Sequence, residues 1–263
     1  MPCKAVLLAL AATLPLPAPA QDNPLLNGET WQALRYDIAG EAPIAGGAGL
    51  FEVEAPYRAH DAATVPVRIR QTDPARAITA ATVVVDENPA PVAAEFAFGP
   101  GMSPIDLELR VRVNQYSDVR VIAATAEGLA MAGRHVKASG GCAAPASRDP
   151  EAARAVMGQM KLRSFVPASG LRREAQVMIR HPNYSGLQRD QVSHLFIPAH
   201  FISELEIRQG AELLLRMEGG ISVSENPVFR FGYVDNGAPA LSVTATDTEG
   251  NRFHADLPKE GGS

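Results

Sequence analysis

The sequence predicts an all-β protein, with two immunoglobulin-like β-sandwich domains joined by a flexible and partly helical connector. Three observations support this prediction. Residues 105–113 alternate apolar and polar side chains, as a strand with one buried face does. Each half of the chain has short strand-like segments separated by Gly, Pro and Asn turns, at the spacing of an antiparallel sandwich. The segment between the halves is rich in Ala, Gly, Ser and Pro and ends in a helix start.

Residues 1–20 resemble an export signal. Lys4 precedes an apolar run from Ala5 to Leu14, and Ala18-Pro19-Ala20 offers small residues for cleavage before Gln21. The alternative is an ordinary hydrophobic N-terminal helix. Cleavage would remove Cys3 and leave Cys142 as the single thiol of a periplasmic protein, with no intramolecular disulfide.

The composition and charge of the chain argue against two kinds of partner, nucleic acid and the membrane interior. The chain has 263 residues, 46% of them hydrophobic, and a formal net charge of -5. That charge argues against nucleic acid, which requires a basic face. After residue 20 no apolar run is long enough to insert into a membrane. No cofactor is expected apart from a group bound covalently to Cys142.

The first half divides into a lead-in segment at 21–47 and a sandwich at 48–137. In the lead-in, Trp31, Leu34 and Ile38 recur at helical spacing and Asn27 is placed to cap the helix. The expected strands of the sandwich are 65–69, 82–85, 92–98, 105–113, 119–123 and 129–136.

The connector, 138–160, is expected to carry a helix from Pro150 to about Met160, opened by Asp149-Pro150-Glu151. The second sandwich, 161–263, has expected strands at 174–181, 201–208, 212–217, 228–234, 240–245 and 252–257. Because the connector is long enough to fold back, the two sandwiches are expected to dock face to face rather than to hang on a free tether.

Cys142 is the candidate functional residue. A lone cysteine is often a small buried hydrophobe. Here Gly140-Gly141 precede it and Ala143-Ala144-Pro145 follow, so its neighbours offer no side chains to fix it in a core. We therefore expect an exposed thiol on a mobile arm, with Gly140 and Gly141 as the hinge. A flexible arm suits a carrier better than a catalyst, whose base and oxyanion site must be rigid, so no catalytic residue is assigned.

Two further groups of side chains are weaker candidates. Four histidines could meet at a metal ion, but no acid or second thiol completes a recognisable set, and no metal site is assigned. Three basic residues just before the arm are either a solvated strand end, or a means of lowering the thiol pKa or attracting anionic sulfur groups. The histidines are His181, His194, His200 and His254, and the basic residues are Arg134, His135 and Lys137.

Gly140-Gly141-Cys142 at the end of an immunoglobulin-like domain resembles the carrier arm of SoxY, the sulfur-carrying subunit of the periplasmic Sox system. Residues 174–257 resemble its partner SoxZ through the motifs Ile179-Arg180-His181-Pro182, Ser185-Gly186, Arg189-Asp190 and Ser224-Glu225-Asn226-Pro227. The fused order is similar to the SoxYZ-like carriers associated with quinoprotein dehydrogenases. The resemblance implies that Cys142 holds a sulfur-containing group covalently while separate sulfur-metabolism enzymes process it.

The sequence departs from SoxY after the cysteine. In SoxY two glycines follow and the chain ends, whereas here Ala143-Ala144-Pro145 follow and the chain continues. A partner must therefore admit a loop of two strands, which leaves open the usual Sox partners and thiosulfate as the substrate. Two alternatives also remain: a non-catalytic accessory module for a quinoprotein dehydrogenase, and a cysteine-dependent enzyme. An exposed thiol would also allow a disulfide dimer through Cys142.

Overall fold

The structure, a computed structural model, describes residues 25, 27–145, 150–165, 170 and 172–259. The predicted signal peptide, Cys3 and the cleavage before Gln21 lie outside these residues, as does Asp149. In the described part, no helix is both long enough and apolar enough to cross a membrane.

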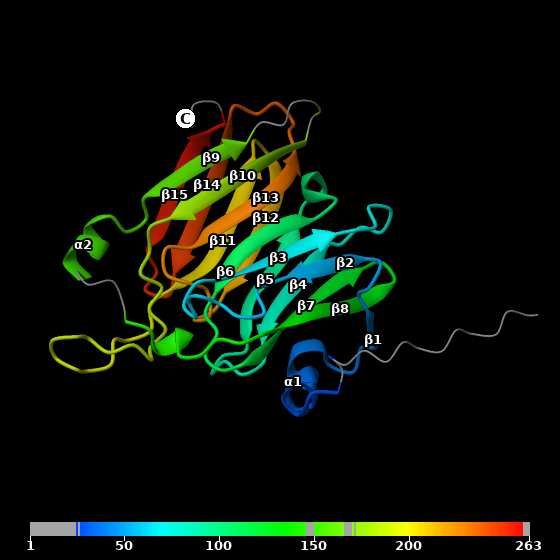
Figure 1. Cartoon of the computed structure of the whole chain (residues 1–263). Helices are drawn as coiled ribbons and strands as arrows, with labels where there is room; N and C mark the ends of the chain where they lie inside the picture. Colours follow the sequence, from blue (N-terminus) through cyan, green and yellow to red (C-terminus); the bar gives the residue numbers. More distant parts are fainter. Residues whose placement is uncertain (1–24, 26, 146–149, 166–169, 171, 260–263) are drawn as a thin grey trace, which may run out of the picture.

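The first domain contains the helix α1 and eight strands, and every strand predicted there is present (Figure 1). The structure adds two short strands that the sequence did not predict, β1 and β2. The bounds are α1 Glu29–Ala39, β1 Ile44–Gly46, β2 Phe51–Glu54, β3 Val65–Gln71, β4 Ala80–Val85, β5 Val92–Phe98, β6 Asp106–Val111, β7 Ser117–Thr125 and β8 Gly128–Val136.

Helix α1 covers the outer face of one sheet. Trp31 is fully buried there against Val84, Ile122 and Met131. The predicted cap is wrong: Gly28, not Asn27, is the N-cap residue, and no side chain caps this helix. The helix is therefore stabilised by the burial of its apolar face rather than by its first turn.

The second domain contains seven strands. The six predicted strands are present, and β9 is an additional one. The predicted connector helix is shorter than expected, because α2 ends at Ala155 and β9 begins at Met160. The bounds are α2 Pro150–Ala155, β9 Met160–Phe165, β10 Arg172–Ile179, β11 Ile202–Gln209, β12 Glu212–Gly219, β13 Val228–Val234, β14 Ala240–Asp247 and β15 Arg252–Pro258.

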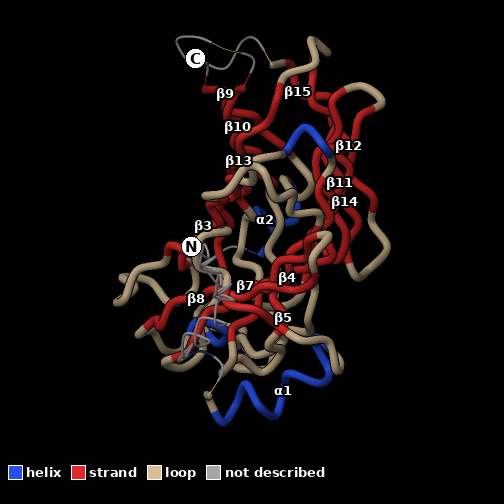
Figure 2. Tube along the Cα trace, turned by 90° about the vertical axis from the view of Figure 1, so that its right-hand side faces the viewer, coloured by secondary structure: helices blue, strands red, loops and turns tan. Residues whose placement is uncertain are grey.

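The two domains join edge to edge. Strand β5 pairs antiparallel with β12, and β6 pairs antiparallel with β13. Both sheets therefore continue through the molecule, in the orders β1-β8-β7-β4-β5-β12-β11-β14-β15 and β2-β3-β6-β13-β10-β9 (Figures 1 and 2). The domains are docked, as predicted, but the face-to-face arrangement is wrong. The reason is physical: each half has unpaired strand edges, and pairing them satisfies their backbone N–H and C=O groups.

One hydrophobic core follows from this joint. It extends without a break from Val67 in the first domain, through Phe96, to Ile207 in the second. Two short 3-10 turns lie at the joint: η2 (Pro100–Met102) packs against β12 and β13, and η3 (Gly141–Ala143) follows β8. The turn η3 positions the candidate site.

Candidate functional site

Cys142 lies in the turn η3 and is completely buried. The predicted exposed thiol on a mobile arm is therefore wrong in this structure. The start of the predicted connector is packed as well, since Ala138 and Gly141 are also buried.

Backbone contacts with the first domain fix the turn. Gly140 donates its N–H to the carbonyl oxygen of Asn114 at 2.8 Å, and Gly141 donates to that of Val113 at 3.0 Å. Gly140 has a left-handed backbone (φ 79°), which favours glycine. At Gly141 a Cβ atom would lie 2.1 Å from the carbonyl oxygen of Ala62, so only glycine allows this close approach. Each glycine of the predicted hinge thus has a separate requirement in the closed turn.

Side chains of the second domain hold the turn from the other side. The Ser185 hydroxyl donates to the carbonyl oxygen of Cys142, and the Gln188 amide donates to that of Ala144 at 2.9 Å. Both side chains belong to the loop between β10 and β11, which lies beside η3 in Figure 1. Small residues such as Gly140 and Ala143 contribute few packing contacts of their own. The turn is fixed instead by hydrogen bonds between its backbone and polar groups from elsewhere in the chain.

Arg112 is the charged residue of this site. It is 1% exposed, and it donates to the carbonyl oxygens of Asn183 at 2.9 Å and Gly141 at 3.4 Å. Burial raises the pKa of the Cys142 thiol, and the positive charge of Arg112 partly offsets that rise. Sequence reasoning missed this role, because the alternation of residues 105–113 places Arg112 on the polar face of the strand. Its burial depends on the turn and on the second domain.

Of the two interpretations of the basic residues before the turn, the solvated strand end is confirmed, since Arg134 and His135 are exposed and the contacts of all three residues lie elsewhere. Arg134 donates to the carbonyl oxygen of Val53 at 3.2 Å, and His135 pairs with Asp118 at 2.9 Å. Lys137 lies 4.9 Å from the centre of the Tyr57 ring. The role proposed for them, lowering the thiol pKa, therefore belongs to Arg112.

An open groove adjoins the turn. Ala143 and Pro145 line one side of it, and Leu187, Arg189 and His194 line the other. The tip of the same loop exposes three large apolar side chains, Val192, Leu195 and Phe196.

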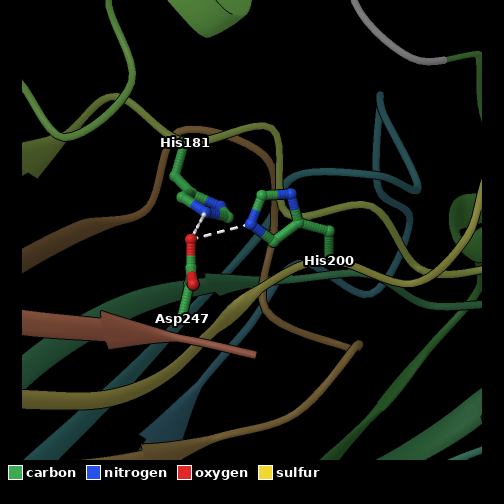
Figure 3. Close-up of side chains that lie close together, drawn as sticks. All are labelled: His181, His200 and Asp247. Carbon is green, nitrogen blue, oxygen red and sulfur yellow. Dashed lines mark hydrogen bonds and ion pairs between the residues drawn. The ribbon is translucent and has the colours of Figure 1, made fainter. Parts of the chain in front are cut away.

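Two of the four candidate histidines do meet, and an acid joins them (Figure 3). His200 Nε2 lies 2.7 Å and His181 Nε2 lies 3.4 Å from the same oxygen of Asp247, Oδ2. The statement that no acid completes the set is therefore wrong: Asp247, at the end of β14, lies far away in the sequence. His194 and His254 are exposed and do not take part.

The geometry of this cluster is that of a hydrogen-bonded cross-link. Asp247 also accepts bonds from the backbone N–H groups of Glu249 and Asn251, at 3.0 and 2.9 Å. Burial lowers the pKa of His181, and donated hydrogen bonds outweigh burial at Asp247, whose pKa falls to about 2. Two imidazoles and a carboxylate could also bind a divalent metal ion, but the hydrogen bonds already account for their arrangement.

The cluster supports the cysteine turn indirectly. His181 contacts the side-chain oxygen of Asn183 at 2.7 Å, and the carbonyl oxygen of Asn183 accepts the bond from Arg112. Asp247 therefore fixes the start of the loop that holds Arg112, Ser185 and Gln188 in place.

The chain was compared with known proteins. Residues 35–142 match the family model described as Sulfur oxidation protein SoxY, and residues 163–258 match that of Sulphur oxidation protein SoxZ. No curated protein matches. Among solved structures, the sulfur carrier protein SoxY from Chlorobium limicola f thiosulfatophilum is 26% identical, with a TM-score of 0.35. That match covers 41% of this chain and 94% of the other.

The two family models match consecutive parts of one polypeptide, and the first match ends at Cys142 itself. The first match ends within η3 and the second begins within β9, the first strand of the second domain. The chain therefore belongs to the SoxYZ-like proteins, with a SoxY domain fused to a SoxZ domain.

Proposed function

We propose that this protein is a periplasmic carrier that holds a sulfur-containing group covalently on Cys142 while partner enzymes process it. The observation that carries the proposal is the position of Cys142. It is the last residue of the SoxY match, and it lies where the SoxY and SoxZ domains meet. The protein itself supplies no general base to the thiol in the described structure; its ionisable neighbour is Arg112, which cannot act as a base.

Carrier action requires the turn to open, because a buried thiol cannot reach another enzyme. Five hydrogen bonds from outside hold the turn: those donated by Gly140 and Gly141 to the first domain, and those that the turn accepts from Arg112, Ser185 and Gln188. If each contributes about 1 kcal/mol, opening requires about 5 kcal/mol, which is within the range of local unfolding. The closed turn would then protect the bound group between encounters with partner enzymes.

The burial of Cys142 also agrees with one alternative function. In a non-catalytic accessory module for a quinoprotein dehydrogenase, Cys142 would be a structural residue that packs the junction. Both hypotheses agree with a closed turn, and they differ in whether the thiol is ever modified.

The mass of the intact protein, exported by its host and purified without reductant, separates them. The carrier hypothesis predicts a sulfur adduct that reductant removes and that Cys142→Ala lacks. A bare thiol in protein from cells that are oxidising sulfur compounds would instead support the accessory module. Turnover by the isolated protein would contradict both.

A further inference from the structure

Two arginines of the SoxY domain are fully buried, but only one has a counter-ion. Arg120 forms ion pairs with Asp86 at 2.7 Å and with Asp118 at 3.3 Å. Arg112 is equally buried, yet no carboxylate lies within ion-pair distance of it in the described part of the chain. Glu225 and Asp61 act on it only from a longer range.

The hydrogen bonds of Arg112 do not make up for this. Its two bonds go to carbonyl oxygens, and the one to Gly141 is long at 3.4 Å. Its buried Nε–H has no partner among the described residues. Burying a cation without an anion is costly, and an unsatisfied donor adds to that cost, so the guanidinium favours a negative charge beside it.

Among the acidic groups that interact electrostatically with Arg112, Cys142 has the largest effect. Arg112 bonds the carbonyl oxygen of Gly141, the residue immediately before the cysteine, and electrostatic interaction couples Arg112 directly to the thiol. The Arg112 Nε–H without a partner is therefore buried in a side chain that bonds the cysteine turn, and Ser185 of the second domain bonds the same turn at the carbonyl oxygen of Cys142.

We propose that Arg112 is an anion-binding residue for the group carried on Cys142, so that the closed turn favours adducts ending in a sulfur oxyanion over neutral ones. The identity of the anion rests on the proposed function. A planar guanidinium with free donors matches the oxygens of a sulfonate, as it does those of a carboxylate or phosphate.

Such an adduct forms with tetrathionate, which supplies the sulfur group and is itself the oxidant. The Cys142 thiolate attacks an inner sulfur of tetrathionate, a new S–S bond forms, and thiosulfate leaves with the electron pair of the broken S–S bond. The product is a cysteine-bound thiosulfonate with one negative charge next to Arg112.

The test uses two adducts of nearly equal size on the full chain. Iodoacetate places a carboxymethyl anion on Cys142 and iodoacetamide places the neutral carbamidomethyl group, each confirmed by intact mass. Urea unfolding at neutral pH then gives the folding equilibrium constant of each form. We expect the ratio of these constants, anionic over neutral, to be about tenfold in the wild type, since a close opposite charge shifts such equilibria by about one pKa unit or more.

Variants assign the effect to Arg112. In Arg112→Gln the ratio of the folding constants should fall to about one. In Arg112→Lys, which keeps the positive charge, most of the tenfold ratio should remain. Arg172→Gln is the matched control, because Arg172 also bonds only carbonyl oxygens, those of Ser103, Met102 and Pro104, and has no electrostatic effect on Cys142. It should lower stability and leave the ratio unchanged.

The wild-type pair alone can overturn the proposal, even if Arg112→Gln does not fold. A neutral adduct as stable as the anionic one would show that Arg112 only cross-links the domains. The tetrathionate adduct should likewise resist reductant longer in the wild type than in Arg112→Gln, with Arg112→Lys close to the wild type. If the anionic preference is found but protein from cells carries no sulfur group, the proposed function fails while the anion site stands.

Discussion

The hydroxyl of Ser185 donates a hydrogen bond to the carbonyl oxygen of Cys142, so a SoxZ-domain residue holds the cysteine turn of the SoxY domain. The contact joins residues 43 positions apart. A residue of the SoxZ domain therefore helps to keep the thiol of the SoxY domain buried. The rate at which a reagent labels Cys142 then measures how often the turn opens.

Loosening the SoxZ-domain contacts should expose Cys142. In the native wild type we expect labelling by a bulky maleimide to be far slower than in denaturant, because the thiol is fully buried. Ser185→Ala or Gln188→Ala should each speed native labelling about fivefold, since each removes a hydrogen bond that contributes about 1 kcal/mol. Mass spectrometry against time measures this.

Ser203→Ala is the control for these variants. Its hydroxyl also donates to a carbonyl oxygen, that of Thr246 at 3.2 Å, but away from the turn. It should leave the labelling rate unchanged. Equal labelling of native and unfolded wild-type protein would show that the turn is open in solution.

The two glycines before the cysteine should respond differently to alanine. At Gly140 a methyl group would touch no other atom, and the strain comes only from the left-handed backbone. We therefore expect Gly140→Ala to lower the unfolding free energy by about 1 kcal/mol. Gly141→Ala places a methyl group within 2.7 Å of the Val113 carbonyl oxygen and closer still to that of Ala62, both backbone atoms. It should displace the turn and greatly speed labelling of Cys142. Similar behaviour of the two variants in urea unfolding and labelling would contradict this geometry.

Replacing the cysteine itself should now have a measurable effect. Cys142→Ala removes a fully buried sulfur and leaves a small void, so we expect the unfolding free energy to fall by about 1 kcal/mol. An exposed thiol would give almost no change. Urea unfolding in the presence of reductant, which prevents the predicted disulfide dimer, provides the comparison.

The histidine cluster should make stability depend on pH. Burial lowers the pKa of His181, so the unfolded chain takes up a proton more readily, and stability should fall as the pH drops below about 6.5. The pKa of Asp247 is lowered to about 2, so its contribution is present above about pH 4 and is lost as the pH falls from there toward 2.

Asp247→Asn tests the acidic part of this profile. The variant should lose about 2 kcal/mol at neutral pH, because hydrogen bonds to a charged acceptor contribute more than neutral ones. The difference from the wild type should shrink below pH 4. The variant should also label faster at Cys142, since Asp247 fixes the loop through His181 and Asn183. A constant difference down to pH 2 would contradict the low pKa.

The strands could be predicted from the sequence because their signal is local. In β6, Leu107, Leu109 and Val111 alternate with polar residues, and these three side chains are fully buried. The burial of Cys142 could not be predicted in this way. Its immediate neighbours are small, as the sequence shows, but Ser185, Gln188 and Arg112 supply the contacts from distant positions.

The same limit applies to the histidine cluster and to the joint between the domains. His181 and His200 are visible as candidates, while Asp247 reaches them only because β14 pairs with β11. Similarly, β5 and β12 both have the pattern of ordinary strands, and nothing local shows that their edges pair with each other.

The edge-to-edge joint predicts how the domains behave when they are separated. Separating the halves would leave one edge of β5 and of β6 unpaired in the first half, and one edge of β12 and of β13 in the second. Core residues such as Phe96 and Met217 would be exposed at these new edges. Unpaired edges of this kind bind other strands. Residues 21–147 and 150–263, expressed together, should therefore purify as a one-to-one complex, and each half alone should aggregate or dimerise.

Replacing Met217, which lies opposite Phe96, by lysine should weaken the complex, whereas Arg252→Lys on the outermost strand β15 should not. Size-exclusion chromatography with light scattering would show these states. Two halves that remain soluble monomers and do not associate would mean that the continuous sheets do not hold the domains together.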